Sequence, residues 1–147
     1  MKKYFNYSKK VKLITASVFA LVAAITLWVI LQENVTTTEI VCLCIAWLPL
    51  IVATGFAPVY YEKTEDEVAV RLLYFKRRYS LDDYSLDHCS IGKGGMARLF
   101  GSGGFFGYLG WFNKKDIGTF LMYSTSGGDK YLKLTNKKTG KKVLIEE

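Results

Sequence analysis

The sequence predicts a membrane α-helical hairpin followed by a small, mainly antiparallel β domain. Residues 13–31 form a run of nineteen residues without a charge, and residues 40–59 form a second uncharged run after a short polar segment. Beyond residue 60, apolar and polar residues alternate over short segments separated by glycine, asparagine or aspartate turns. The chain therefore divides into a basic cytoplasmic tail (1–12), a two-helix transmembrane hairpin (13–59) and a β domain (60–147).

Each uncharged run is long enough to cross a bilayer as one helix. A helix rises about 1.5 Å per residue, so the nineteen residues of the first run nearly match a hydrocarbon core of about 30 Å. A cleavable signal peptide is the alternative for the first run, and it would leave the β domain on the opposite side of the membrane. The length of the run and the presence of a second run favour the hairpin.

The distribution of charge predicts the orientation of the hairpin. The net charge is +7; the tail before the first run carries five lysines, whereas the loop between the runs carries Glu33 and Glu39. Lysine and arginine near membrane segments stay on the cytoplasmic side. We therefore expect a multi-pass protein of the cytoplasmic (inner) membrane, with both termini cytoplasmic and the acidic loop outside.

Six segments after the hairpin are typical of short strands. They are residues 68–74, 75–81, 84–91, 119–125, 131–135 and 143–145. Strands of this length, broken by turn residues and without any long segment of helical periodicity between them, predict an antiparallel barrel or sandwich.

Residues 98–118 are unusual because glycines alternate with aromatic residues. No GxxxxGK[ST] pattern is present, so this segment is not predicted to cradle a phosphate. One interpretation is that the glycines allow close strand approach while the aromatic side chains fill the core. The other is that the aromatic side chains, beside basic residues, contact the bilayer interface or a partner. We favour the core, with some exposed tips.

Two groups of residues are candidates for contact with lipid or with a partner. The first is a basic cluster in the early β domain, and the second lies in and just after the glycine-rich segment. They are Lys76, Arg77, Arg78, Phe105, Phe106, Tyr108, Trp111, Lys114 and Lys115.

The sequence predicts no catalytic, metal or cofactor site. The chain has a single histidine, His88, and its three cysteines lack the spacing of a zinc site. His88 and Cys89 are adjacent in a predicted strand, so their side chains point to opposite faces and do not form a nucleophilic pair. We expect a protein that is not an enzyme and that binds neither nucleic acid nor a small-molecule substrate.

The order of these features resembles the bacterial pleckstrin-homology-like (PH-like) domain proteins, in which a membrane hairpin often precedes a compact antiparallel β domain. The strongest similarity is Arg98, the run GYLGWF at residues 107–112, and then Gly118, Phe120 and Tyr123. The resemblance covers residues 60–145 and implies a PH-like barrel or sandwich.

Two features depart from that family pattern. PH-like barrels usually end in a helix that plugs one open end, whereas this sequence stops at Glu147, directly after the last predicted strand. We therefore expect no C-terminal plug helix. Phosphoinositide-binding members use basic residues in the first hairpin, and here Leu72 and Leu73 follow Arg71 where a second arginine is expected. Headgroup recognition is not implied.

These observations favour a membrane-anchored interaction module that contacts a partner protein or copies of itself at the cytoplasmic membrane. One alternative is a domain that senses anionic lipid through its basic residues. A second alternative is an accessory subunit of a membrane transporter.

Overall fold

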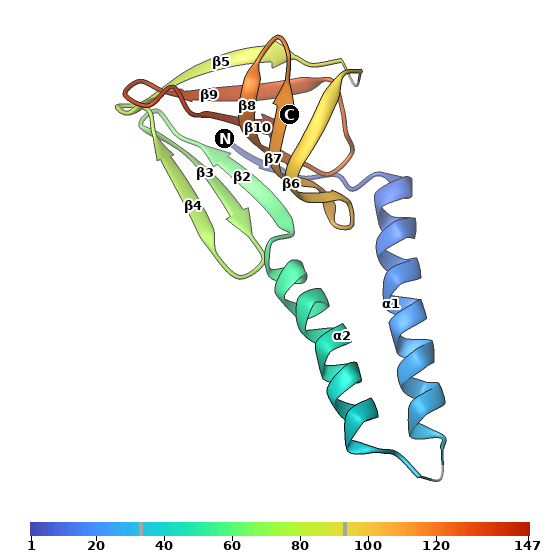
Figure 1. The fold of residues 1–147 in the computed structure, drawn as a ribbon. Helices are drawn as coiled ribbons and strands as arrows, with labels where there is room; N and C mark the ends of the chain where they lie inside the picture. Colours follow the sequence, from blue (N-terminus) through green and yellow to red (C-terminus); the bar gives the residue numbers. More distant parts are fainter. Residues whose placement is uncertain (33, 93) are drawn as a thin grey trace.

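The computed structural model describes residues 1–32, 34–92 and 94–147 of the chain. Glu33, one of the two acidic residues on which the predicted orientation depends, lies outside the described residues. Two long helices, α1 (Lys9–Ile30) and α2 (Thr37–Gly55), extend side by side from one end of a β domain (Figure 1). Both are long and apolar enough to cross a membrane, and few of their side chains are buried.

Capping residues set where the helices begin. The Ser8 side chain accepts a hydrogen bond from the Val11 amide, so α1 starts four residues before the predicted span. Thr36 and Glu39 form a reciprocal capping box at the start of α2. The predicted end of the second span at residue 59 is wrong, because α2 ends at Gly55 and Pro58 begins a strand. A proline disfavours the helical conformation of the residue before it, so the helix does not continue to Pro58.

The first residues of the chain form part of the β domain. Strand β1 (Lys2–Tyr4) pairs antiparallel with β2 (Pro58–Lys63), and the Lys2 ammonium lies 3.8 Å from the centroid of the Tyr60 ring. The sequence predicts only a basic tail here. Because β1 leads into α1 and β2 follows α2, the helical pair is inserted between two hydrogen-bonded neighbouring strands.

The strands form two sheets. Strands β3 (Glu67–Leu72) and β4 (Lys76–Ser80) complete a four-stranded sheet in the order β1-β2-β3-β4. The second sheet has the order β5-β9-β10-β8-β7-β6, and its members are β5 (Tyr84–Ser90), β6 (Met96–Gly104), β7 (Gly107–Lys114), β8 (Gly118–Ser124), β9 (Lys130–Asn136) and β10 (Lys142–Glu146).

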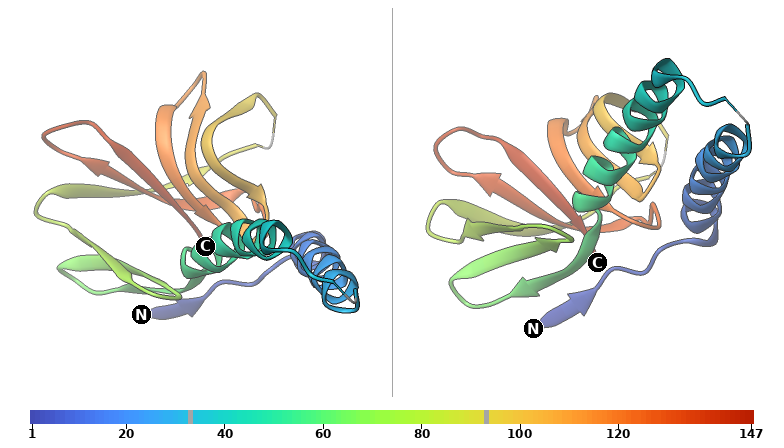
Figure 2. Two further views of the ribbon diagram at one scale, coloured as in Figure 1. Left: turned by 60° about the horizontal axis from the view of Figure 1, so that its bottom comes forward. Right: turned by 90° about the horizontal axis from the view of Figure 1, so that it is seen from below.

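The prediction of two apolar helices and a mainly antiparallel β domain is confirmed. The six predicted strand segments correspond to β3, β4, β5, β8, β9 and β10. Two details differ: β8 and β10 pair in parallel, and across the described residues the two sheets stay separate without closing into a barrel (Figure 2). The architecture is therefore an open sandwich.

Strands β6 and β7 lie in the glycine-rich segment and were not predicted as strands. Gly101 (φ 117°) and Gly110 (φ 129°) face each other across the pair. A Cβ atom on either one would lie 2.1–2.2 Å from a backbone oxygen of the other strand. Only glycine permits this approach, which confirms the interpretation that these glycines allow close strand contact.

The six-stranded sheet carries buried side chains on both faces. Val143 and Ile145 of β10 join the core between the two sheets, whereas Leu144 between them joins a second core with Phe120 and Met122. Successive strand residues point to opposite faces, so residues 120–123 of β8 and residues 143–145 of β10 are apolar without interruption.

A buried carboxylate connects the last strand to the start of α1. Glu146 of β10 accepts hydrogen bonds from the backbone amides of Thr125 (2.6 Å), Ser126 (3.0 Å) and Gly128 (2.8 Å). The Thr125 carbonyl in turn accepts from the Ser8 amide at 3.2 Å, and the Thr125 hydroxyl donates to the Asn6 carbonyl. The cap of α1 is thereby attached to the second sheet.

Candidate functional site

The turn between β3 and β4 rests on the end of α2. The amides of Leu73 and Tyr74 donate to the carbonyls of Ala57 and Gly55, at 3.0 and 3.3 Å. The rings of Phe56 and Phe75 make an edge contact with centroids 5.0 Å apart. The four-stranded sheet is therefore held against α2 through both backbone and aromatic contacts.

The turn between β6 and β7 rests on α1. The Phe106 amide donates to the Thr15 hydroxyl at 3.1 Å, and the Phe19 ring lies 5.9 Å from Phe105 and 6.1 Å from Phe106, centroid to centroid. Phe106 has a left-handed backbone conformation (φ 55°), which makes the tight two-residue turn. Thr15 and Phe19 lie inside the predicted first span, so this turn packs alongside the apolar part of the helix.

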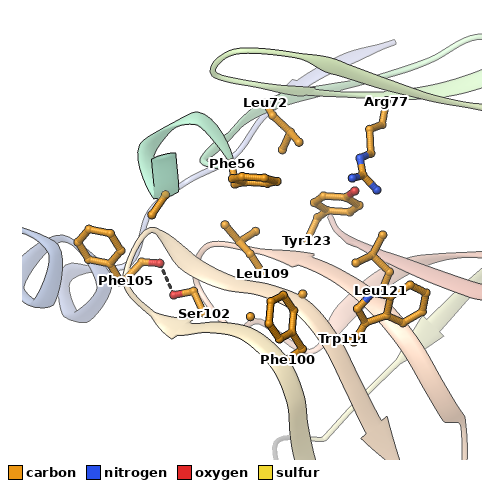
Figure 3. Close-up of a pocket in the computed structure, with 13 residues that line it drawn as sticks. Phe56, Leu72, Arg77, Phe100, Ser102, Phe105, Leu109, Trp111, Leu121 and Tyr123 are labelled. Carbon is orange, nitrogen blue, oxygen red and sulfur yellow. Dashed lines mark hydrogen bonds between the residues drawn. The ribbon is translucent and has the colours of Figure 1, made fainter. Parts of the chain in front are cut away.

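A cavity of about 290 Å³ lies between the two sheets, beside the β6–β7 turn and the end of α2 (Figure 3). The end of α2 and the β6–β7 turn line it at the helix side, and β4, β7 and β8 line its other end. The thirteen lining residues are Ala53, Phe56, Leu72, Arg77, Phe100, Gly101, Ser102, Phe105, Leu109, Gly110, Trp111, Leu121 and Tyr123.

The walls of the cavity are apolar except at one end. The Ser102 hydroxyl is already bonded to the Phe105 carbonyl, and the Tyr123 hydroxyl lies 3.3 Å from that of Tyr79. Burial raises the pKa of Tyr79, so the Tyr79 hydroxyl stays protonated. Arg77 approaches Tyr123 from the opposite sheet (Figure 3) and supplies the only charged side chain among the described lining residues.

The structure separates the three residues of the basic cluster. Lys76 pairs with Glu62 at 3.1 Å. Arg77 and Arg78 are both exposed, and of these two only Arg77 lines the cavity. Because neighbouring strand residues point to opposite faces, Arg78 points away from the cavity. Within the described part of the chain, none of the ion pairs involves Arg77.

The residues expected from the glycine-rich segment also lie in different places. Phe105 and Trp111 line the cavity, and Phe106 packs on α1. Tyr108 packs against the second core on the other face of the sheet. Lys114, which donates to the Gly92 carbonyl at 2.8 Å, and Lys115 lie near the β7–β8 turn, at the end of the domain away from the helices.

Several cavity residues were not among the contact residues predicted from the sequence. Leu121 and Tyr123 occupy alternate positions of a predicted strand, and Phe100 belongs to the aromatic set of the glycine-rich segment. The periodicity shows that these side chains share a face of a strand. It contains no information about which strands face each other, so it does not place them in one cavity with Phe56.

The titratable side chains outside the cavity form no reactive cluster in the parts of the chain that are described. No group of three or more His, Cys, Asp or Glu residues there is placed to hold a metal ion. The His88 Nδ1 atom lies 3.0 Å from the Glu147 carboxylate, on an exposed surface. Burial raises the pKa of the Cys89 thiol, which lowers the thiolate fraction on which nucleophilic reactivity depends.

No family model, no curated protein and no solved structure matches this chain.

Proposed function

We propose that this chain is an integral protein of the cytoplasmic membrane, with α1 and α2 as its spans and the β domain in the cytoplasm. The exposed apolar surfaces of both helices support the proposal. So does the position of Lys9, Lys10 and Lys12 at the end of α1 that adjoins the β domain, because lysines remain on the cytoplasmic side. The resemblance to bacterial PH-like proteins is proposed as its family relationship.

We further propose that the β domain is a non-enzymatic interaction module that binds a partner protein or a second copy of the chain. The observation that carries this proposal is β6, an edge strand of the larger sheet. Leu99 and Phe100 are 59% and 77% exposed on it. An unpaired edge with exposed apolar side chains is a template for the addition of another strand.

Leu99→Lys tests this proposal, because a lysine on an edge strand opposes strand addition. The full chain, extracted in a mild detergent, is expected to show a complex larger than one chain, and the variant is expected to lose it. Ser85→Lys, on the exposed edge strand β5 at the other side of the same sheet, is the control. Intact-mass measurement of the complex decides; a monomeric parent chain, or equal complexes in both variants, contradicts the proposal.

Contact with anionic lipid is the second candidate function. Leu73 and Tyr74 are 49% and 58% exposed in the turn that rests on the end of α2, and the basic cluster of β4 follows directly. Exposed aromatic and basic side chains beside a membrane span suit the headgroup region.

A further inference from the structure

We propose that the cavity between the sheets holds one acyl chain of an anionic membrane lipid, with the lipid phosphate at Arg77. This inference rests on the proposed insertion of α1 and α2 in the membrane. It assigns a ligand to a defined cavity, rather than a general affinity of the domain surface for lipid.

The position of the cavity gives it access to the bilayer. Its helix-side end is lined by Ala53 and Phe56 at the end of α2, and by Phe105, whose ring contacts Phe19 of α1. In the inserted protein this end of the cavity adjoins the apolar part of both helices. A lipid chain beside them enters without crossing water, at the high local concentration of the membrane.

The lining of the cavity selects an apolar occupant. Leu72, Leu109 and Leu121 form its walls, and the hydroxyls of Ser102 and Tyr123 already have partners. A volume of about 290 Å³ lies at the lower limit of ligand pockets, which begin near 300 Å³, and it suits a single chain. A peptide segment fits less well, because its backbone amides and carbonyls would need polar partners in the walls.

Arg77 gives the cavity its polarity. It lies at the end away from the helices, opposite Leu121 and Trp111 (Figure 3), and no carboxylate among the described residues pairs with it. The planar guanidinium offers paired donors to phosphate oxygens. An acyl chain that lies in the cavity with its methyl end toward the helices therefore places its phosphate beside a cation that no carboxylate among the described residues neutralises.

Tryptophan fluorescence in vesicles tests the inference, because Trp111 lines the cavity and Trp28 is 66% exposed on α1. Two single-tryptophan full-length chains are needed: one keeps Trp111 (W28F, W47F) and the other keeps Trp28 (W47F, W111F). Each is reconstituted with a fixed mixture of phosphatidylglycerol and phosphatidylcholine. Bromine, which quenches tryptophan, is placed on the acyl chains of one lipid or of the other.

The expected result is that both lipids quench Trp28, whereas phosphatidylglycerol quenches Trp111 preferentially. One basic side chain at a lipid surface enriches an anionic lipid about fivefold. Arg77→Gln is expected to remove this preference, and Ala53→Phe, which fills the helix-side end, to reduce the quenching of Trp111 by both lipids. Arg78→Gln, the matched loss of charge one residue away on the opposite face, is expected to leave Trp111 unchanged.

The outcomes separate the failure of this inference from that of the proposed function. If Trp28 is quenched but Trp111 shows no headgroup preference, or keeps its preference in Arg77→Gln, the chain is inserted and the inference is overturned. If Trp28 is not quenched, the proposed membrane insertion fails, and the inference fails with it. Preferential quenching of Trp111 by an added brominated fatty acid overturns the assignment to a phospholipid.

Discussion

Glu146 shows how a single side chain ties the last strand to the first helix. Glu146 is 7% exposed, and its carboxylate accepts hydrogen bonds from three backbone amides and from Ser124 and Ser126. Burial alone would raise the pKa of Glu146, but the hydrogen bonds from Ser126, Gly128 and Thr125 outweigh it and lower the pKa below its ordinary value of 4.5. The charged carboxylate therefore stabilises the fold.

The lowered pKa of Glu146 predicts a pH dependence of stability. A carboxyl group with a lower pKa in the folded chain contributes stability that is fully present above its unfolded pKa, here 4.5. That contribution is lost as the pH falls from 4.5 through the folded value. Glu146→Gln is expected to lower the free energy of unfolding at pH 7 by about 2 kcal/mol, and to weaken the pH dependence below 4.5.

Thermal unfolding of the full chain in mild detergent, followed between pH 3 and 7, measures both effects of Glu146→Gln. Glu65→Gln, on an exposed turn between β2 and β3, is the control. An unfolding midpoint of Glu146→Gln equal to that of the parent chain at every pH would show that the buried hydrogen bonds contribute nothing.

At the scale of elements, the β6–β7 hairpin joins the sandwich to the helical pair. Its turn packs on α1 through Phe105 and Phe106, whose rings contact Phe19. The Phe19 ring also lies 6.3 Å from the Trp47 ring of α2, centroid to centroid, and the Trp47 indole NH donates to the Thr26 hydroxyl of α1 at 2.9 Å. Phe19 therefore connects the hairpin to the contact between the two helices.

Thr15→Val is expected to loosen this hairpin without unfolding the sandwich. The change keeps the size of the side chain but removes the acceptor of the Phe106 amide. Hydrogen exchange of the segment 100–112 in the full chain is expected to become faster by about fivefold, which corresponds to the net loss of one hydrogen bond of about 1 kcal/mol.

Thr38→Val, at an exposed position in the first turn of α2, is the control for Thr15→Val. Equal exchange of the segment 100–112 in both variants would mean that the hydrogen bond to α1 does not hold the turn.

At the scale of the whole molecule, the insertion of the helical pair between β1 and β2 joins the β domain to it at two points. The chain leaves the four-stranded sheet after Tyr4 and returns to the same sheet at Pro58. Both connections are short, and the β3–β4 and β6–β7 turns add contacts to α2 and α1. The domain is therefore held at the ends of both helices. A single flexible linker would instead let the domain move away from them.

The proposed orientation predicts which positions a membrane-impermeant thiol reagent reaches in intact cells. Cys42, Cys44 and Cys89 are first replaced by alanine, and single cysteines are then introduced. Val35→Cys, in the loop between the helices, is expected to react from outside. Lys115→Cys, exposed in the β7–β8 turn, is expected to react only after the membrane is made permeable.

The opposite pattern would place the β domain outside, as a cleaved signal peptide also would. Reaction of both positions in intact cells would show that the hairpin does not hold the domain in the cytoplasm. If Val35→Cys does not react in intact cells while Lys115→Cys does, the orientation is the reverse of the proposed one.

Local patterns predicted the elements that carry a strong periodicity or a long apolar run. The helices and the strands β3 and β4 are of this kind, because uncharged length and alternation are visible within a few residues. The same patterns did not predict β6 and β7, whose glycines interrupt the alternation, or β1, whose three residues are too few to show one. Of the expected contact residues, Arg77, Phe105 and Trp111 line one cavity.

Two helices able to cross a membrane and a series of short strands could be predicted from the amino-acid sequence alone, because they follow from hydrophobicity and period along neighbouring residues. The three-dimensional arrangement was needed to show that β1 pairs with β2 and that Arg77 meets Leu121 and Trp111 across an apolar cavity. The physical reason is distance along the chain. Which strands pair, and which sheet faces cover each other, depend on hydrogen bonds and burial shared between residues far apart in sequence.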